Sequence, residues 1–377
     1  MMKNVSKKTQ CVHSGKFDDE RMHGINTPIY TSTSYQYLDT EERLYPRYFN
    51  TPNQWTVANK ICALEKAEAG LIFSSGMAAI STASLSFLKT GDHIVFQPNL
   101  YGGTQHFVTS KLNSFGIDYT IAASQNTTDI EAALLPNTRV VYIETPSNPL
   151  LSITDIAEIA ELCRSRQIVS IIDNTFASPI NQNPIVFGID IVLHSATKYL
   201  GGHSDICAGV IVSSKEKINR IWELAINLGG SLNAITCYLL ERSIKTLALR
   251  VAQQNSSAYE IAAFLNEHPK IKRVYYPGLS GHHGHEIAKK QMTGYGGMLS
   301  FELKEKDSIE FQKDLKLIKA SMSLGGVESI ICSPALTSHR HLSSDERKKA
   351  GIPDELLRLS VGIEDIQDLI ADLQQAL

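Results

Sequence analysis

The pattern of apolar and polar positions between about residues 55 and 230 predicts a chain that alternates between strands and helices. Short apolar runs rich in β-branched residues predict strands at 93–97, 118–122, 140–144, 169–173 and 190–194. Helical spacing predicts helices at 76–88 and 154–167 between them. Strands that alternate with helices are joined by right-handed crossovers, so we predict an α/β fold with a mostly parallel central sheet.

The pattern is different toward the two ends of the chain. Residues 1–50 have no clear period, and we expect an extended arm that links or wraps a neighbouring subunit. Beyond about residue 235 we expect a long helix at 234–266, a half-exposed strand at 298–303 and a terminal helix at 364–377. The pattern therefore predicts an arm at 1–50, a large domain at 51–245 and a smaller α+β domain at 246–377.

Composition narrows the class of protein. The chain has 377 residues, 36 Lys and Arg, 39 Asp and Glu, a net charge of −3 and 43% apolar residues. These values argue against a strongly basic nucleic-acid-binding surface and against a disordered acidic chain. Six cysteines without a CxxC pair favour reduced thiols over a disulfide scaffold or a zinc site. With no apolar signal region or membrane-length apolar run, we predict a cytoplasmic enzyme that binds neither nucleic acid nor membrane.

Chemically reactive side chains follow several of the predicted strands. Asp173 ends one strand and Lys198 follows another, whereas Ser75 precedes a helix whose free N–H groups can hold a phosphate. Tyr101 follows a third strand. Taken singly, these are compatible with a turn aspartate, a surface lysine, an ordinary helix cap and a core tyrosine. Together they supply the amine, acid, phosphate anchor and flat ring that pyridoxal 5'-phosphate requires.

The sequence also resembles the Cys/Met-metabolism family of fold-type I pyridoxal-phosphate enzymes. That family includes cystathionine γ-synthase, the cystathionine lyases, methionine γ-lyase and O-acylhomoserine sulfhydrylase. The matching strings run in the family's order along nearly the whole chain: Tyr45-Pro46-Arg47, Ser75-Gly76-Met77, Tyr101-Gly102-Gly103-Thr104, Glu144-Thr145-Pro146-Ser147-Asn148-Pro149, Asp173-Asn174-Thr175-Phe176, Ser195-Ala196-Thr197-Lys198-Tyr199, Ser323-Leu324-Gly325-Gly326-Val327-Glu328-Ser329 and Arg358-Leu359-Ser360-Val361-Gly362.

The resemblance implies a role for each matching cofactor-site residue, with the cofactor held by the large domain. Lys198 would bond to the cofactor and then move protons at Cα and Cβ of the substrate, and Asp173 would pair with the pyridine nitrogen. The phosphate would be bound by a set of small residues and by two residues of a neighbouring subunit. These are Ser75, Gly76, Met77, Ser195 and Thr197 of the same chain, and Tyr45 and Arg47 of the neighbour. The family would then require a homo-oligomer with shared active sites, which we expect to be a tetramer built as a dimer of dimers.

The resemblance also implies how the substrate is held. Tyr101 would stack on the cofactor ring and act as acid or base toward the leaving thiol. Arg358 would bind the α-carboxylate in a two-pronged ion pair, with Asn148 and Ser323 assisting. The string after Arg47 departs from the family's usual Asn-Pro-Thr and carries about one additional residue, so the shape of that loop differs from the family pattern.

The residues that separate family members point in two directions. Relatives that act on cystathionine usually place an acid where this chain has Met322 and Leu44, so an apolar pocket that suits a thioether is expected. Conversely, many methionine γ-lyases carry a cysteine at Gly103 and a Lys-Asp pair near 228–231. We predict a carbon–sulfur lyase that acts on a sulfur amino acid by γ- or β-elimination. The alternatives are γ-replacement, as in cystathionine γ-synthase or a sulfhydrylase, and an aminotransferase on the same fold.

Two further features are expected to carry no chemistry. The histidine-rich segment 282–285 lacks the second histidine of an HExxH motif, so we predict no metal site there. Arg340, His341 and the charged run at 345–349 are expected to form a solvated loop and the start of a helix.

Overall fold

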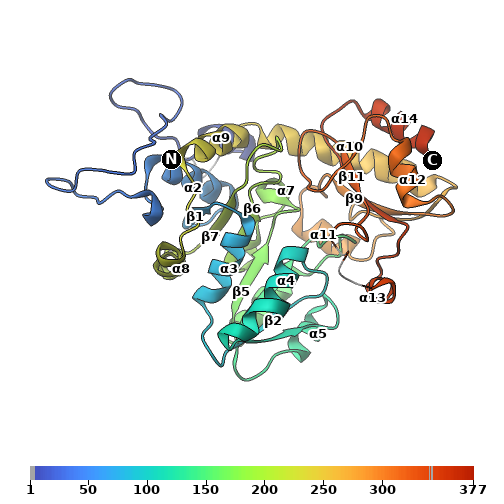
Figure 1. The fold of residues 1–377 in the computed structure, drawn as a ribbon, viewed down its shortest axis with the longest axis horizontal. Helices are drawn as coiled ribbons and strands as arrows, with labels where there is room; N and C mark the ends of the chain where they lie inside the picture. The colour runs from blue at the N-terminus through green and yellow to red at the C-terminus, as the bar shows by residue number, and fades with distance from the viewer. Residues whose placement is uncertain (1–4, 339, 341–342) are drawn as a thin grey trace.

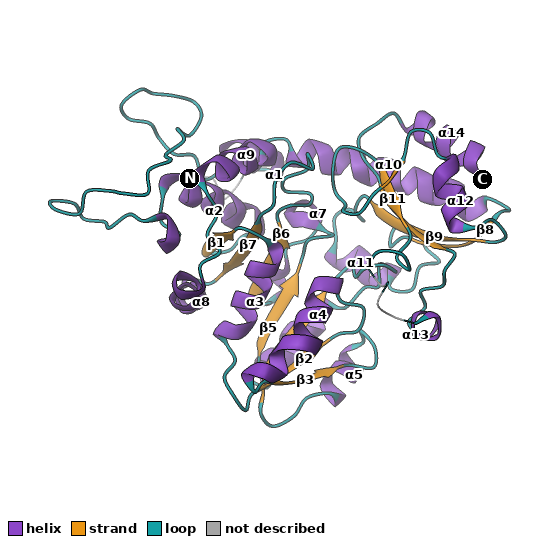
Figure 2. Cartoon of the chain, viewed as in Figure 1, coloured by secondary structure: helices purple, strands orange, loops and turns teal. Residues whose placement is uncertain are grey.

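The computed structural model describes residues 5–338, 340 and 343–377 and contains two sheets (Figures 1 and 2). The larger sheet has seven strands, in the order β1-β7-β6-β5-β4-β2-β3, and the smaller has five, in the order β10-β11-β12-β9-β8. The described part of the chain thus confirms the α/β class and a second, smaller α+β region.

The larger sheet contains the five predicted strands and two that were not predicted. Its parallel part consists of β2 to β6, and its strand bounds are β1 (Ala69–Phe73), β2 (His93–Phe96), β3 (Asp118–Ile121), β4 (Thr138–Glu144), β5 (Val169–Asp173), β6 (Ile191–Ser195) and β7 (Gly209–Ser213). The unpredicted β1 and β7 pair antiparallel to each other, and β7 also pairs antiparallel to β6. Ser195 is therefore the last residue of a strand, β6, that pairs parallel to β5 on one side and antiparallel to β7 on the other.

Helices cover both faces of this sheet, which explains its continuous apolar runs. On β4, Val140 and Tyr142 pack into one core while Val141 and Ile143 pack into the other, because side chains alternate across a strand. The helices of this part of the chain, with two short 3-10 turns, are α2 (Pro52–Glu65), α3 (Gly76–Ser86), α4 (Gly102–Lys111), η2 (Leu112–Phe115), α5 (Thr127–Ala132), α6 (Ile156–Ser165), α7 (Ser178–Asn181), η3 (Pro184–Phe187), α8 (Lys215–Leu228) and α9 (Ala234–Ile244). Helix α3 packs Ile80 into the same core as Val140 and Tyr142, so that face of the sheet carries α3.

The amino-terminal arm is extended over most of its length but is not wholly irregular. The expectation of an arm without regular structure missed helix α1 (Lys7–His13), which contacts α2 and α10. Buried Lys60 of α2 donates hydrogen bonds to the carbonyl oxygens of Cys11, Val12 and Ser14 and so anchors the carboxyl end of α1. The following segment loops away from the molecule in Figure 1 and ends in the 3-10 turn η1 (Pro46–Tyr48).

The long helix expected at 234–266 is two helices. Helix α9 ends at Ile244, and α10 (Leu247–Glu267) begins after Lys245 and Thr246. Helix α10 contacts α9 as well as strands β8 and β9, so it links the smaller sheet to the helix that precedes it. The domain boundary predicted after residue 245 falls in the break between these helices, and it stays a prediction.

The smaller sheet shows one wrong expectation. Its strands are β8 (Ile271–Tyr275), β9 (Met298–Leu303), β10 (Lys319–Ala320), β11 (Ile330–Cys332) and β12 (Leu356–Ser360), with helices α11 (His285–Gln291), α12 (Ser308–Asp314), α13 (Ser344–Lys349) and α14 (Ile366–Ala376) around them. Strand β9 was expected to be half exposed, but all six of its residues are buried. Its polar positions have partners inside the protein: Ser300 donates to the carbonyl of Pro149 at 2.7 Å, and Glu302 accepts from the hydroxyl of Tyr275 at 2.5 Å.

None of the described helices is long and apolar enough to cross a membrane. His341, which was expected to lie in a solvated loop, falls outside the described residues, whereas Arg340 is exposed.

Candidate active site

A cavity of about 770 Å³ lies at the carboxyl ends of β4, β5 and β6, between the two sheets. Eleven predicted site residues line it: Ser75, Gly76, Met77, Tyr101, Asn148, Asp173, Ser195, Thr197, Lys198, Ser323 and Arg358. The location agrees with the rule that ligands of open α/β sheets bind beyond the carboxyl ends of the strands. The smaller sheet contributes Arg358, from β12, and Ser323, from the segment between β10 and β11.

Lys198 lies in the turn that follows β6, and its amine points into this cavity. Its Nζ atom donates a hydrogen bond to the Ser323 hydroxyl at 2.8 Å. Burial, with the nearby positive charge of Arg358, lowers the pKa of Lys198 to about 8. A larger fraction of this amine is therefore neutral and nucleophilic at neutral pH than of an ordinary surface lysine.

Asp173 ends β5 and contributes a carboxylate to the floor of the cavity. The backbone N–H of Thr175 donates to its Oδ1 atom at 2.9 Å. Burial raises the pKa of Asp173, while hydrogen bonds from Thr175 and the proximity of His194 oppose this rise. A cationic ring nitrogen facing this carboxylate would favour its ionised form and would itself be kept protonated.

The amino terminus of α3 forms a cradle of the size and polarity that a phosphate needs. Ser75 accepts the N–H of Ala78 at 3.0 Å, and the other N–H groups of this first turn have no partner within the helix. A Cβ atom at Gly76 would lie 3.0 Å from Cβ of Ser195, so a side chain there would fill the space between them. Thr197 is held across this space because its hydroxyl accepts the N–H of Ala208 at 3.1 Å.

Arg358 is 8% exposed and is fixed by two of its three nitrogens. Nη1 donates to the side-chain oxygen of Asn148 at 2.6 Å, and Nη2 donates to the carbonyl of Ser323 at 3.0 Å. Among the described residues, the buried Nε atom has no hydrogen-bond partner. A buried guanidinium with an unpartnered N–H requires an acceptor, and a carboxylate is the acceptor that its geometry suits best.

Tyr101 stands at the entrance of the cavity and is 48% exposed. Its ring lies against Gly103, where a Cβ atom would be 2.6 Å from Cε1 of the ring and 2.9 Å from Sδ of Met77. A cysteine at position 103 would therefore require the ring to move, which gives a physical meaning to the glycine at this position.

The structure does not bring Tyr45 and Arg47 to the cavity of their own chain. Both lie at η1, where Tyr45 is 40% exposed and Arg47 donates a hydrogen bond to the carbonyl of Ile226 on α8. Of the two apolar positions expected around the substrate, Met322 lines the cavity but is 70% exposed, and Leu44 is not among the lining residues.

Several lining residues had no predicted role. Glu144 and Phe176 belong to the strings that match the family, whereas Cys207 is the exposed one of six free cysteines and lies near the Lys198 amine. The strings gave a signal for the first two, because Glu144 ends one predicted strand and Phe176 lies three residues after another. Nothing in the sequence marked Cys207. The described residues hold no cluster of three or more His, Cys, Asp or Glu suited to a metal ion.

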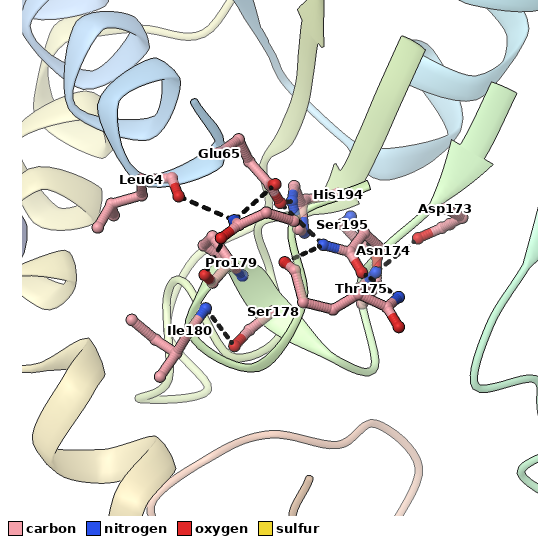
Figure 3. Close-up of polar contacts among 12 residues, drawn as sticks. Leu64, Glu65, Asp173, Asn174, Thr175, Ser178, Pro179, Ile180, His194 and Ser195 are labelled. Atoms are coloured by element: carbon pink, nitrogen blue, oxygen red, sulfur yellow. Dashed lines mark hydrogen bonds and ion pairs between the residues drawn. The ribbon is translucent and has the colours of Figure 1, made fainter. Parts of the chain in front are cut away.

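A buried polar cluster supports the strand ends from the opposite face of the sheet (Figure 3). Glu65, at the end of α2, accepts hydrogen bonds from His194 at 2.6 Å, from Asn174 at 2.8 Å and from Asn183 at 3.1 Å. Asn174 and His194 directly neighbour the cavity residues Asp173 and Ser195. The cluster therefore fixes the backbone from which those two side chains project.

Comparison with known proteins agrees with this geometry. A family model described as Cys/Met metabolism PLP-dependent enzyme matches residues 8–377. The chain is 42% identical over 377 residues to a cystathionine gamma-lyase of Bacillus subtilis, with 99% of both chains covered. It is 40% identical over 395 residues to an L-methionine gamma-lyase of Fusobacterium nucleatum, covering 100% of this chain and 99% of the other. The crystal structure of a cystathionine gamma-lyase from Lactobacillus plantarum, complexed with L-serine, superposes with a TM-score of 0.95 at 40% identity, covering 99% of this chain and 98% of that one.

Proposed function

We propose that this chain, which belongs to the Cys/Met metabolism family of PLP-dependent enzymes, is a carbon–sulfur lyase that removes a thiol from a sulfur amino acid by γ- or β-elimination. The observation that carries the proposal is the meeting of the Lys198 amine, the Asp173 carboxylate and the unpartnered Nε of Arg358 in one cavity. The family establishes pyridoxal 5'-phosphate as the cofactor, and the residues present fit it.

The fit of the cofactor to these residues follows from their chemistry. The first turn of α3, with Ser195 and Thr197, would bind the phosphate, and Asp173 would face the ring nitrogen. The Lys198 amine would bond to the aldehyde carbon. When bound, pyridoxal phosphate supplies an electron sink that acidifies the Cα hydrogen of an attached amino acid.

Three residues of this chain then carry the elimination. Arg358 binds the α-carboxylate and so aligns the Cα hydrogen with Lys198. Lys198, whose pKa of about 8 allows it to accept and return a proton, removes protons from Cα and, for γ-elimination, from Cβ. The Tyr101 phenol donates a proton to the sulfur as the carbon–sulfur bond breaks, and water then hydrolyses the released enamine to a 2-oxo acid and ammonia.

Met322 offers no charged partner to a distal ammonium group, which favours a substrate with an apolar sulfur substituent, but at 70% exposure it does not enclose that substituent. Gly103, in contrast, stands where many methionine γ-lyases carry a cysteine, and so favours the other members of the family. The proposal therefore covers both methionine and cystathionine, and γ-replacement on an activated homoserine remains the alternative because it shares the same residues. An aminotransferase would use the same lysine and acid but would release no thiol.

A substrate panel tests the proposal. The purified protein is expected to be yellow and to release thiol and a 2-oxo acid from methionine, homocysteine, cystathionine or cysteine. Cystathionine formation from an acylhomoserine and cysteine, without thiol release from any of the four, would instead establish γ-replacement. Turnover of cystathionine alone would contradict the argument from Met322.

We also propose that the working unit is a homo-oligomer in which the arm completes the site of a neighbouring chain. Two observations support this role for Tyr45 and Arg47. Tyr45 is exposed, and neither residue lines the cavity of its own chain. Arg47→Ala and Lys198→Ala chains, each inactive alone, are expected to regain roughly a quarter of wild-type activity when unfolded and refolded together, as random pairing in a two-fold dimer predicts. Absence of recovery would show that each chain uses its own arm. Sedimentation of the wild-type protein would decide between dimer and tetramer.

A further inference from the structure

Glu144 ends β4 and lines the cavity, but none of the roles described above uses it. Its side chain is 6% exposed. Its Oε2 atom accepts a hydrogen bond from the backbone N–H of Tyr101 at 2.8 Å, and the Tyr142 hydroxyl lies 3.4 Å from Oε1. Its carbonyl accepts a further bond from the Gln97 side chain at 2.7 Å. Both the backbone and the carboxyl group of Glu144 are therefore fixed.

The bond to Tyr101 lies at the start of helix α4. Tyr101 precedes the first residue of this helix and provides no side-chain cap of its own. Glu144, from a strand more than forty residues later, instead accepts the backbone N–H of this N-cap residue, the donor that the side chain of the third helical residue accepts in a capping box. Helix α4 carries Gly103, His106 and Thr109 into the lining of the cavity, so this one bond fixes the origin of an entire wall.

The Tyr101 ring depends on this backbone anchor. The ring is half exposed, and no hydrogen bond of its hydroxyl is seen within the described part of the chain. Its position is set by the backbone of Tyr101 and by contact with Gly103 and, beyond it, Met77. A shift of the Tyr101 backbone would therefore move the phenol directly.

Glu144 is also the partner of Asp173 in the ladder between β4 and β5. Neighbouring strands lie about 4.8 Å apart and paired residues point to the same face, so the two carboxyl groups are adjacent. Burial, together with Asp173, raises the pKa of Glu144 well above its usual range. A protonated Glu144 still accepts the Tyr101 N–H, and it places no second negative charge beside Asp173.

We propose that Glu144 is a positioning residue that holds the backbone of Tyr101 at the start of α4 and thereby sets where the phenol stands over the cavity. The inference rests on the proposed function only in giving the phenol a part in the reaction. It predicts that the acceptor atom of Glu144 matters and that its charge does not.

Two variants of the cofactor-loaded enzyme separate these properties. Glu144→Gln keeps an oxygen acceptor of the same shape, and we expect kcat within about threefold of wild type. Glu144→Leu keeps the volume but leaves a buried N–H unpartnered, and we expect kcat to fall about 10- to 100-fold, with a smaller change in KM. Hydrogen exchange of the peptide that covers residues 98–106 should accelerate in Glu144→Leu and stay unchanged in Glu144→Gln.

Glu302→Leu is the matched control. Glu302 is likewise a buried strand carboxylate that accepts from a tyrosine, at 2.5 Å, but it lies in the smaller sheet and does not line the cavity. We expect it to lower the unfolding temperature without changing exchange at 98–106 or kcat by more than about twofold.

Wild-type kcat and exchange in Glu144→Leu, or equal damage in Glu144→Gln, would overturn the inference. If the wild-type protein released no thiol, the proposed function would fail, while the exchange data would still decide whether Glu144 anchors Tyr101.

Discussion

The ends of β5 and β6 present two faces that treat polar groups in opposite ways. On one face, Glu65, His194 and Asn174 are buried and hydrogen-bonded to one another. On the other, the Arg358 Nε atom has no partner among the described residues, and Lys198 makes a single hydrogen bond to Ser323. Asn174 and His194 thus belong to the satisfied cluster, while their chain neighbours Asp173 and Ser195 line the cavity that holds the Lys198 amine and the unpartnered Arg358 Nε.

This difference indicates that one face of the strand ends serves stability and the other serves ligand binding. Buried polar groups with complete hydrogen bonding restrict the backbone to one arrangement. A buried donor that lacks a partner in the protein can still form a hydrogen bond to a ligand, and that bond then contributes to binding. We therefore expect changes on the Glu65 face to lower stability and changes on the cavity face to lower activity.

The largest expected effect on the cavity face is that of Lys198→Ala. Without an amine to move protons, 2-oxo acid formation should fall by at least about 1000-fold. The fold should be retained, because the change removes a buried amine whose charged form is disfavoured there. Initial rates and thermal unfolding of the same preparation measure both effects. A large loss of stability with Lys198→Ala would remove the distinction between the two faces.

The matching change on the other face is Glu65→Leu. It removes the acceptor of the His194 ring and one acceptor each of Asn174 and Asn183 in a buried site, so we expect a loss of about 3–5 kcal/mol of stability. Glu131→Leu is the control, since its bond to Arg166 is exposed and should contribute less than about 1 kcal/mol. Denaturant unfolding of both variants gives the comparison. Equal losses would mean that the buried cluster is not what holds the strand ends.

How far the sequence predicts each face follows from the same contrast. The cavity residues lie in short strings with restricted chemistry at strand ends, and eleven of the thirteen predicted residues line one cavity. Glu65 was not marked, because its partners lie more than one hundred residues away and only folding brings them together. The burial of β9 likewise depends on tertiary contacts. Its alternating pattern predicted that one face is exposed, but Ser300 and Glu302 on that strand have hydrogen-bond partners inside the protein.

Two antiparallel strands and one helix break were not predicted, for local reasons. Strands β1 and β7 pair antiparallel, so the alternation of parallel strands with helices did not indicate them. The break after Ile244 has no glycine or proline to announce it, and the two helices therefore had one continuous pattern. The roles of Tyr45 and Arg47 depend on a neighbouring chain, and they stay predictions.

A smaller effect is expected from Arg358→Lys, which keeps the charge in the cavity but removes the planar fork. Loss of the paired hydrogen bonds to a carboxylate should lower kcat/KM about 10- to 150-fold, mostly through KM. Stability should change little, because the bonds of Arg358 to Asn148 and to the Ser323 carbonyl lie at the cavity wall. A drop in kcat with unchanged KM would assign Arg358 to the reaction step and not to substrate binding.

The most subtle test of the comparison is the pH dependence of the Lys198 amine. Its pKa is lowered from 10.5 to about 8, first by burial and then by the charge of Arg358, so the neutral, reactive form dominates above about pH 8. The rate at which cofactor-free protein is labelled at Lys198 by pyridoxal phosphate and borohydride should rise with pH through about 8 and then level off.

Arg358→Gln removes a positive charge that favours the neutral amine, so it should move this midpoint upward. Glu65→Gln changes the other face of the sheet and should leave the midpoint in place. A wild-type midpoint near 10.5, or an equal shift in both variants, would show that the amine is not controlled by the cavity face.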